Sequence, residues 1–406
     1  MKKLIFIVLG FLFIACPSTQ KNAAKIYLGQ GQYDKAKEQL LLGIEQSPGD
    51  FEYYALLAKA EIGLTNWVGA GKAFQDAFKI DSINTMNWIL KDKINIDVYW
   101  QTFYNAALAL FAEKKYEDAL TKLRYAQLIN PSDVKQYILE GAIYSEMGKT
   151  EMANKAYTKA LNIDPENPEA YYFIGKALFN NKSYDSSSVY FNSAIKYFEI
   201  KNERIRKVIF QNIPTHNAEL EYEIIKLWMD KKFDELNQLV KTKLGFDGGL
   251  DAHKQNIELF FKTTDVTAQS YYWLGMAYYK LNKDSLALKN FNKTLELMPS
   301  DLNALFFTGE VLIKLTKYPE AIGYFEKVVQ LKPDDRDAWW YLGALNLRLK
   351  DYKKAIDIYE NNVLRLDPKF IEALQNLASA YQALGNNKKA REIMVKVEQL
   401  KKEQKK

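Results

Sequence analysis

Three segments decide the fold: Tyr116-Glu-Asp-Ala119, Tyr318-Pro-Glu-Ala321 and Tyr352-Lys-Lys-Ala355. Aligning the sequence on them gives a period of 34 residues. Self-similarity at such a period is typical of repeat architectures, in which each copy is one supersecondary unit. The copies fall at 17–50, 51–84, 100–133, 134–167, 168–201, 268–301, 302–335, 336–370 and 371–404, and the eighth carries one extra residue before Pro368.

Two columns of the repeat hold small residues. The eighth place is occupied by Ala24, Ala58, Ala107, Gly141, Gly175, Gly275, Gly309, Gly343 and Ala378. The twentieth place is occupied by Ala36, Ala70, Ala119, Ala153, Ser187, Ala287, Ala321, Ala355 and Ala390. We expect two antiparallel helices of each copy to touch at these places, because a bulky residue there would cost about 1–3 kcal/mol by overpacking.

The twenty-fourth place is large. It holds Leu40, Phe74, Leu123, Tyr157, Phe191, Phe291, Phe325, Tyr359 and Met394, which we expect to fill the space beside the small residues. This combination of columns resembles the tetratricopeptide repeat (TPR) family, and the resemblance covers most of the chain. It implies an all-α fold, a right-handed superhelical solenoid of helical hairpins in which neighbouring hairpins bury one another's apolar faces.

Two segments interrupt the repeats. We expect residues 85–99 to lengthen the first helix of the third copy. Residues 202–267 are an irregular helical insert, within which 217–250 fits the repeat columns as a degenerate copy with Leu236 in place of the small residue, and residues 245–249 are a loop. The predicted organisation is therefore 1–15, 16–201, 202–267 and 268–406, with the insert acting as a hinge or a bend between two arrays.

The N-terminus carries the features of a secretory signal. Met1-Lys2-Lys3 is basic, Leu4 to Phe13 is apolar but too short to span a bilayer, and Ala15 precedes the single cysteine, Cys16. The Phe13–Cys16 segment resembles the lipobox of bacterial lipoproteins, with Phe13 where leucine is usual. The resemblance implies that residues 1–15 are removed and that Cys16 is lipidated. The alternative is an ordinary cleaved signal with an incidental cysteine.

Composition narrows the functional classes. Apolar residues make up 48% and charged residues 26%, as in globular proteins. The net charge of +6 falls to about +4 without Lys2 and Lys3, and the remaining excess lies in the C-terminal tail, so the sequence does not favour nucleic acid binding. With its one cysteine assigned to lipid, the chain depends on packing rather than on disulfides.

Catalytic motifs are sparse. Both histidines, His216 and His253, fall in the insert, with Asp247 and Asp251 near the second, and no spacing supports a metal site. The sequence contains no phosphate-binding glycine-rich loop after a strand and no Gly-x-Ser-x-Gly motif. We therefore expect no enzymatic activity, no metal and no cofactor.

The TPR resemblance places the fifth, ninth and twelfth residues of each copy on the concave, partner-binding side of the first helices, and we read the fifth and twelfth places. Here these places form an aromatic series, which differs from the Lys/Asn/Arg pattern of chaperone-binding TPR domains. The expected protein-binding groove comprises Tyr104, Phe111, Tyr172, Phe179, Tyr272, Tyr279, Phe306, Trp340 and Leu347. Aromatic side chains are favoured at interaction sites. The alternative is that these side chains only pack between helices.

The sequence thus predicts a membrane-anchored TPR scaffold or adaptor that binds other proteins in the bacterial cell envelope. Its expected location is the periplasmic face, most simply of the outer membrane, with lipid on Cys16 as the anchor. One alternative is a glycan-binding envelope lipoprotein, with sugars stacked on the aromatic series. Another is an enzyme hidden in residues 202–267. The partner, the membrane and the oligomeric state are not encoded in any motif.

Overall fold

The computed structural model describes residues 17–210, 218–229, 232–243 and 250–404, and all regular elements within them are helices. The expected all-α fold is confirmed. The chain divides into two compact units, residues 1–165 and 166–406, and each is described by itself. The signal segment, Cys16, the loop at residues 245–249 and His216 lie outside the described residues, and so does the side chain of His253.

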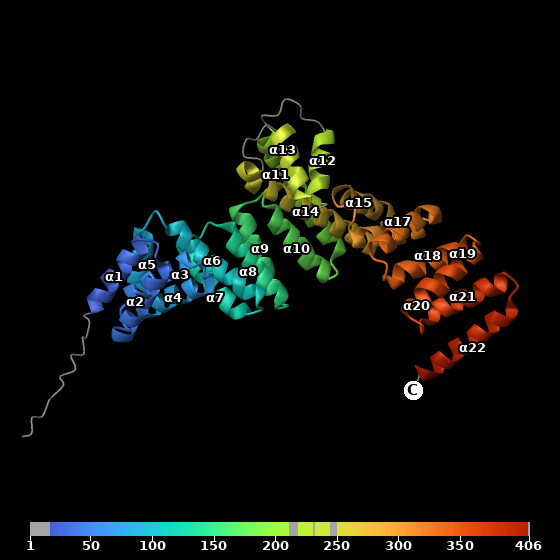
Figure 1. Cartoon of the computed structure of the whole chain (residues 1–406), viewed down its shortest axis with the longest axis horizontal. Coiled ribbons are helices and arrows are strands. Elements are labelled where there is room, and N and C mark those ends of the chain that lie inside the picture. Colours follow the sequence, from blue (N-terminus) through green and yellow to red (C-terminus); the bar gives the residue numbers. More distant parts are fainter. Residues whose placement is uncertain (1–16, 211–217, 230–231, 244–249, 405–406) are drawn as a thin grey trace, which may run out of the picture. The chain divides into compact units, whose positions relative to one another are not determined.

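The N-terminal unit contains four stacked helix pairs and one additional helix (Figure 1). The bounds are α1 Pro17–Gly29, α2 Tyr33–Gln46, α3 Phe51–Gly63, α4 Trp67–Ile80, α5 Ser82–Lys91, α6 Ile96–Ala112, α7 Tyr116–Ile129, α8 Val134–Glu146 and α9 Thr150–Ile163.

The C-terminal unit contains five further pairs and a side hairpin. The bounds are α10 Pro168–Asn180, α11 Tyr184–Phe210, α12 Ala218–Met229, α13 Phe233–Lys243, α14 Leu250–Lys280, α15 Asp284–Leu297, α16 Leu302–Lys314, α17 Tyr318–Leu331, α18 Arg336–Arg348, α19 Tyr352–Ile358, η1 Tyr359–Val363, α20 Leu364–Leu366, α21 Ile371–Ala383 and α22 Asn387–Glu403. Among the described residues, the nine pairs of the two units correspond to the nine predicted repeats.

The small and large columns meet inside the pairs that have glycine at the eighth place, whereas Met394 of the last pair is 40% exposed. A β-carbon built on Gly175 would lie 2.9 Å from the Phe191 ring, and one on Gly343 would lie 2.6 Å from the Tyr359 ring. In each case the eighth place faces the twenty-fourth place of the same repeat, and the twentieth-place residues are buried. The expected helix contact is therefore present, and the large ring is a direct partner of the small residue.

The turn within each pair repeats one backbone conformation. The fifteenth place has a positive φ in all nine pairs of the described residues. This left-handed residue ends the first helix and satisfies its last carbonyl groups, as in the bond from Asn66 N–H to Glu61 O at 2.9 Å. Glycine fills the place only at Gly31, Gly148 and Gly385; elsewhere it is held by Thr65, Lys114, Lys182, Asn282, Thr316 and Lys350.

Polar caps and prolines delimit the helices. Asp301 accepts a hydrogen bond from Ala304 N–H at 2.7 Å, and Asp335 accepts one from Ala338 N–H at 3.0 Å. Each cap satisfies a backbone donor that the first turn of a helix leaves free. Six prolines lie between pairs, because proline cannot continue the preceding helix: Pro48, Pro131, Pro165, Pro299, Pro333 and Pro368.

Residues 85–99 differ from the prediction that they only lengthen the next helix. Its last residues lengthen α6, which begins at Ile96, but its first part, up to Lys91, belongs to the separate helix α5. Asp92 fixes the junction between the two helices, because it accepts hydrogen bonds from Tyr99 Oη at 2.6 Å and Asn95 Nδ2 at 2.8 Å. Lys59 of α3 lies 2.9 Å from the same carboxylate. This junction turns the chain and ends α5, so a single long helix does not form.

The expected hinge at 202–267 is also revised. The predicted boundaries fall inside α11 and α14, which pack antiparallel: Lys283 pairs with Asp185 at 3.2 Å, and Asn202 bonds Thr267 at 3.1 Å. The C-terminal half of α14 therefore takes the first-helix place next to α11, and the array continues without a break.

The degenerate copy forms a hairpin, α12–α13, beside the distal halves of these two helices (Figure 1). Its contacts are apolar: Leu236 is fully buried in a cluster with Ile205 of α11 and Phe261 of α14. Leucine in place of the small residue suits a helix pair that packs as a side branch rather than as one more layer of the array. The division into compact units falls at 165/166 because the fifth repeat packs along α14.

The extra residue of the eighth repeat appears as a π-helical turn. The second helix of that repeat runs as α19, η1 and α20, with the wide turn at Tyr359–Val363. A π-bulge absorbs one added residue without ending the helix. Tyr359 therefore keeps its place against Gly343, and Asn376 of the next repeat donates to its hydroxyl at 2.9 Å.

Candidate functional site

The predicted groove residues lie on the first helices of the repeats. Tyr104 and Phe111 are on α6, and the remaining seven are on α10, α14, α16 and α18. None of the nine side chains is freely exposed: Tyr172 is 5% exposed and the others are half-buried. The rings are therefore partly covered, in the way that the packing alternative expects, and the protein-binding groove stays a prediction.

The fifth-place rings are covered because they pack on the large ring of their own repeat. Tyr272 lies 5.9 Å from Phe291, and Phe306 lies 5.5 Å from Phe325 in an edge-to-face arrangement. Tyr172 makes the same contact with Phe191 at 6.1 Å. Edge-to-face pairs stabilise beyond the area they bury, so these residues contribute to the core as well as to the surface.

The twelfth-place rings have a different support. Phe179 lies 5.1 Å from Tyr184, and Phe111 lies 6.1 Å from Tyr116, which are the first residues of the second helices. Tyr279 lacks such a neighbour; instead, the Lys314 ammonium lies 3.9 Å from its ring centroid. Lys314 also lies 3.5 Å from Asp284, so it is held over the ring from two sides.

Three consecutive first helices are joined by a polar contact that the sequence did not reveal. Glu310 of α16 accepts hydrogen bonds from Tyr279 of α14, at 3.1 Å, and from Tyr341 of α18. Tyr341 also stacks on Phe325 with 4.7 Å between centroids. Glu310 occupies a ninth place, which was expected to face the groove, and Tyr341 occupies a sixth place, which was not; neither residue was among the predicted groove residues. A carboxylate at one place with tyrosines in the adjacent copies was the available signal.

Both tyrosines are held in their protonated, donating form. Burial and the Glu310 carboxylate raise the pKa of Tyr279 to about 12. The same two causes, with the hydrogen bond to Glu310, raise the pKa of Tyr341 well above its usual range. At neutral pH the three side chains therefore form a fixed network, which orients the half-exposed rings along the first-helix face.

Basic side chains border this network. Lys280, Lys314 and Arg348 share the thirteenth place of three successive repeats. The Arg348 guanidinium lies 4.6 Å from the ring centroid of Tyr318, and the Lys280 ammonium lies 5.7 Å from that of Tyr279. The site can therefore offer a partner an apolar floor, a fixed carboxylate and a row of cations.

The described residues offer no metal-binding cluster of three or more His, Cys, Asp or Glu side chains. No nucleophile–base pair emerges from the network either, since Tyr279, Glu310 and Tyr341 serve as two donors and one shared acceptor. What the arrangement can do chemically is bind.

Family models described as tetratricopeptide or TPR repeats match several stretches that together cover more than half of the chain. These are residues 22–50, 141–182, 168–199, 268–301, 306–369 and 346–403. The match at 268–301 has the same limits as the sixth predicted repeat. With the helix pairs described above, these matches show that the chain belongs to the tetratricopeptide-repeat family.

Individual relatives are distant. The chain is 24% identical over 200 residues to the Hsp70-Hsp90 organizing protein of Triticum aestivum, covering 43% of this chain and 34% of that protein. It is 24% identical over 244 residues to the human protein O-mannosyl-transferase TMTC3, covering 59% of this chain and 23% of that protein. The chain thus spans about a third of these relatives or less.

Among solved structures, the crystal structure of YrrB, described as a TPR protein with an unusual peptide-binding site, is similar to this chain. It is 19% identical, with a TM-score of 0.42 over 62% of this chain and 95% of that one.

Proposed function

We propose that the protein is a TPR scaffold that binds a segment of a partner protein along the first-helix face of its C-terminal unit. The observation that carries this proposal is the Tyr279–Glu310–Tyr341 network. It fixes the side chains of three successive helices before any partner arrives, and a surface that is already ordered loses less conformational entropy on binding. The Hsp70-Hsp90 organizing proteins among its relatives are consistent with a role in bringing proteins together.

The ring contacts favour a peptide over a sugar. Stacking of a sugar requires an open ring face. One face of Tyr279 carries Lys314 at 3.9 Å, and one face of Tyr341 is stacked on Phe325 at 4.7 Å. The edges of the rings, the tyrosine hydroxyl groups and the basic side chains remain, and these can bind the backbone and the acidic side chains of a polypeptide. This is why we place glycan binding second.

Membrane attachment is the second part of the proposal. We propose that Cys16 carries the lipid and that the protein acts at the bacterial envelope, as the basic and apolar start of the sequence indicates. In the described residues no helix is both long and apolar enough to cross a membrane. The role proposed is non-enzymatic, although TMTC3 shows that TPR segments also occur within transferases.

The binding test uses crosslinked pulldown from native membranes with the full chain and a Lys314→Glu/Arg348→Glu variant. Both residues lie at the surface, with the Lys314 side chain 35% exposed, so the variant should keep its helical circular dichroism and lose only the modest stabilisation of the Lys314–Asp284 pair, about 1 kcal/mol or less. Loss of a specific partner would support the proposal. The matched control is Lys327→Glu/Lys353→Glu, which reverses two exposed charges on second helices. Equal capture by all three proteins would exclude the first-helix face.

The anchor test is separate. The intact mass of the purified protein should show removal of residues 1–15 and addition of lipid, and a Cys16→Ser variant should lack the lipid. An unmodified cysteine in the mature protein would reject the anchor and leave the binding proposal unaffected.

A further inference from the structure

Helix α5 is apolar on two sides. Its inner side buries Ile89 completely and packs Trp88 against Tyr99 of α6. Its outer side presents Ile83, which is 73% exposed, and Leu90, which is 42% exposed. These two are seven residues apart and therefore lie on one face of the helix. Ile94, in the turn that follows, is 92% exposed and extends the same series.

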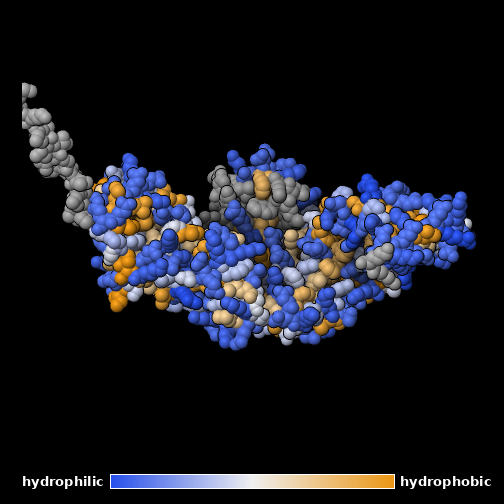
Figure 2. All heavy atoms as spheres, turned by 90° about the horizontal axis from the view of Figure 1, so that it is seen from below, coloured by the Kyte–Doolittle hydropathy of each residue, from blue (hydrophilic) through white to orange (hydrophobic). Residues whose placement is uncertain are grey.

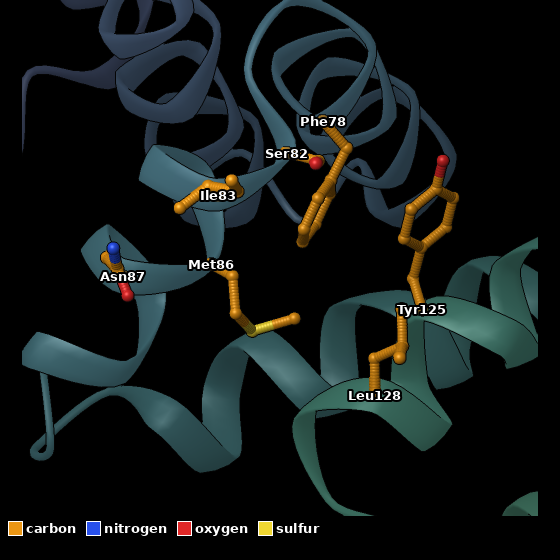
Figure 3. A pocket seen from close by; sticks show the side chains of 7 residues that line it. All are labelled: Phe78, Ser82, Ile83, Met86, Asn87, Tyr125 and Leu128. Atoms are coloured by element: carbon orange, nitrogen blue, oxygen red, sulfur yellow. The ribbon is translucent and has the colours of Figure 1, made fainter.

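The apolar surface continues onto α7. Phe78, Met86, Tyr125 and Leu128 surround a hollow beside Ile83 (Figure 3), with a volume of about 420 Å³. Its floor is the stacked pair Phe78–Tyr125, at 4.8 Å, and its rims are Ile83 and the 62% exposed Leu128. On the face shown in Figure 2, apolar side chains (orange) gather over the N-terminal unit. Exposed apolar area of this kind marks an interaction surface.

Charge distinguishes the C-terminal end of α5. Lys91 and Lys93 are exposed, and neither forms an ion pair with another described residue. The acid between them, Asp92, is compensated by Lys59 at 2.9 Å. Asp81 caps the opposite end of the helix, and Asp97 is already in α6. Ile94 therefore follows two lysines that have no ion-pair partner in the described part of the chain.

We propose that this surface, formed by Ile83, Leu90, Lys91, Lys93 and Ile94, lies on an anionic lipid bilayer. Aliphatic side chains enter the boundary between headgroups and acyl chains, and neighbouring lysines bind anionic headgroups while their stems stay in the apolar layer. This contact goes beyond the proposed scaffold function and needs no lipid on Cys16. It would fix which side of the N-terminal unit faces the membrane.

Site-specific fluorescence tests the contact on the full chain. In a Cys16→Ser background, the substitution Ile94→Cys places a lone thiol for an environment-sensitive nitrobenzoxadiazole label. The matched control is Leu331→Cys, a 50% exposed position on α17. With vesicles of phosphatidylglycerol and phosphatidylcholine that contain spin-labelled lipid, the label at position 94 should shift to the blue and be quenched several-fold more than the label at 331. Any attachment through residues 1–15 is common to both proteins, so the comparison reports on orientation.

Two further variants sharpen the result. Lys91→Gln/Lys93→Gln should reduce the quenching at position 94 and remove its dependence on phosphatidylglycerol and on salt. Ile83→Ser should reduce it without changing the salt dependence. A label at 94 that stays in water, or is quenched no more than the label at 331, would overturn the proposal. If Ile83→Ser instead abolished a protein crosslink while the label stayed in water, the surface would be a protein interface. Failure of Cys16 lipidation, measured by mass, would leave this test unchanged.

Discussion

The ring of Phe325 occupies the space into which a side chain at Gly309 would project. A β-carbon there would lie 2.7 Å from two ring carbons. Gly309→Ala gains about 1 kcal/mol of helix propensity but should lose about 1–3 kcal/mol to overpacking. We expect a net loss of stability of up to about 2 kcal/mol, measured by chemical denaturation.

Gly323 provides the control for this prediction. It lies in α17, only two residues before Phe325, and a β-carbon on it would meet nothing within 4 Å. Gly323→Ala should therefore stabilise by about 0.5–1 kcal/mol. If both alanine variants stabilised the protein, helix propensity rather than close packing would determine the effect of substitutions at the eighth place.

The left-handed turn residues should respond to glycine according to their shape. Thr316 has φ +60° and is β-branched, whereas Asn282 has φ +55° and is a residue type that tolerates this region. Thr316→Gly should stabilise by about 0.5–1 kcal/mol, since relief of the left-handed strain exceeds the entropy that glycine adds to the unfolded chain. Asn282→Gly should change stability by less. Equal shifts of the melting temperature in the two variants would show that local contacts, rather than backbone strain, determine the change in stability.

Lys122 of α7 should be a source of instability. Its side chain is 5% exposed, and its ammonium bonds only neutral acceptors, Gly71 O at 3.2 Å and Gln75 Oε1. Burial lowers the pKa of Lys122 to about 8. Because the folded pKa is below the unfolded value, the cost is full below pH 8 and falls as pH rises toward 10.5.

Lys122→Met should therefore stabilise by about 1–2 kcal/mol at pH 7, and the gain should shrink between pH 8 and 10. The exposed Lys353→Met is the control and should change stability by about 0.5 kcal/mol or less. A gain at Lys122 that is constant over this pH range would mean that packing, not charge, is responsible.

Asp92 should make the α5–α6 junction sensitive to acid. Despite the opposing effect of partial burial, hydrogen bonds from Tyr99, Lys59 and Asn95 lower the pKa of Asp92 to about 2. Its folded pKa is below its unfolded value, so its contribution is present above pH 4 and is lost as pH falls toward 2.

Asp92→Asn should destabilise by about 1–2 kcal/mol at pH 7, with faster hydrogen exchange of residues 82–91. The exposed Asp97→Asn serves as comparison. Unchanged exchange in the Asp92 variant would show that apolar contacts alone hold α5.

The repeated parts of the fold could be predicted from the sequence because the residues that determine them are local and periodic. Gly309 and Phe325 recur with fixed spacing, and the extra residue before Pro368 was visible as a change of period. How the chain absorbs that residue was not visible, since a π turn and a longer loop cost the same residue count. In the structure, a π turn accommodates the extra residue and keeps Tyr359 against Gly343.

Other features depend on contacts between distant segments. The continuity of the array rests on pairs such as Asp185–Lys283, and no periodicity spans the residues between them. The candidate site shows the same limit. Tyr279 was predicted from its column, but Glu310 matters only because Tyr279 and Tyr341 reach it from the two adjacent helices.

Helices α11 and α14 each form part of the repeat array with one half and pack against the α12–α13 hairpin with the other half. At 27 residues, α11 extends about 40 Å, and its two ends lie in two different clusters of the C-terminal unit. Such a helix transmits a displacement from one of its ends to the other. A force applied where Ile205 meets the hairpin reaches the first-helix layer through the hydrogen bond between Glu199 and Tyr271. The α12–α13 hairpin is thus linked through α11 to the first-helix layer of the array.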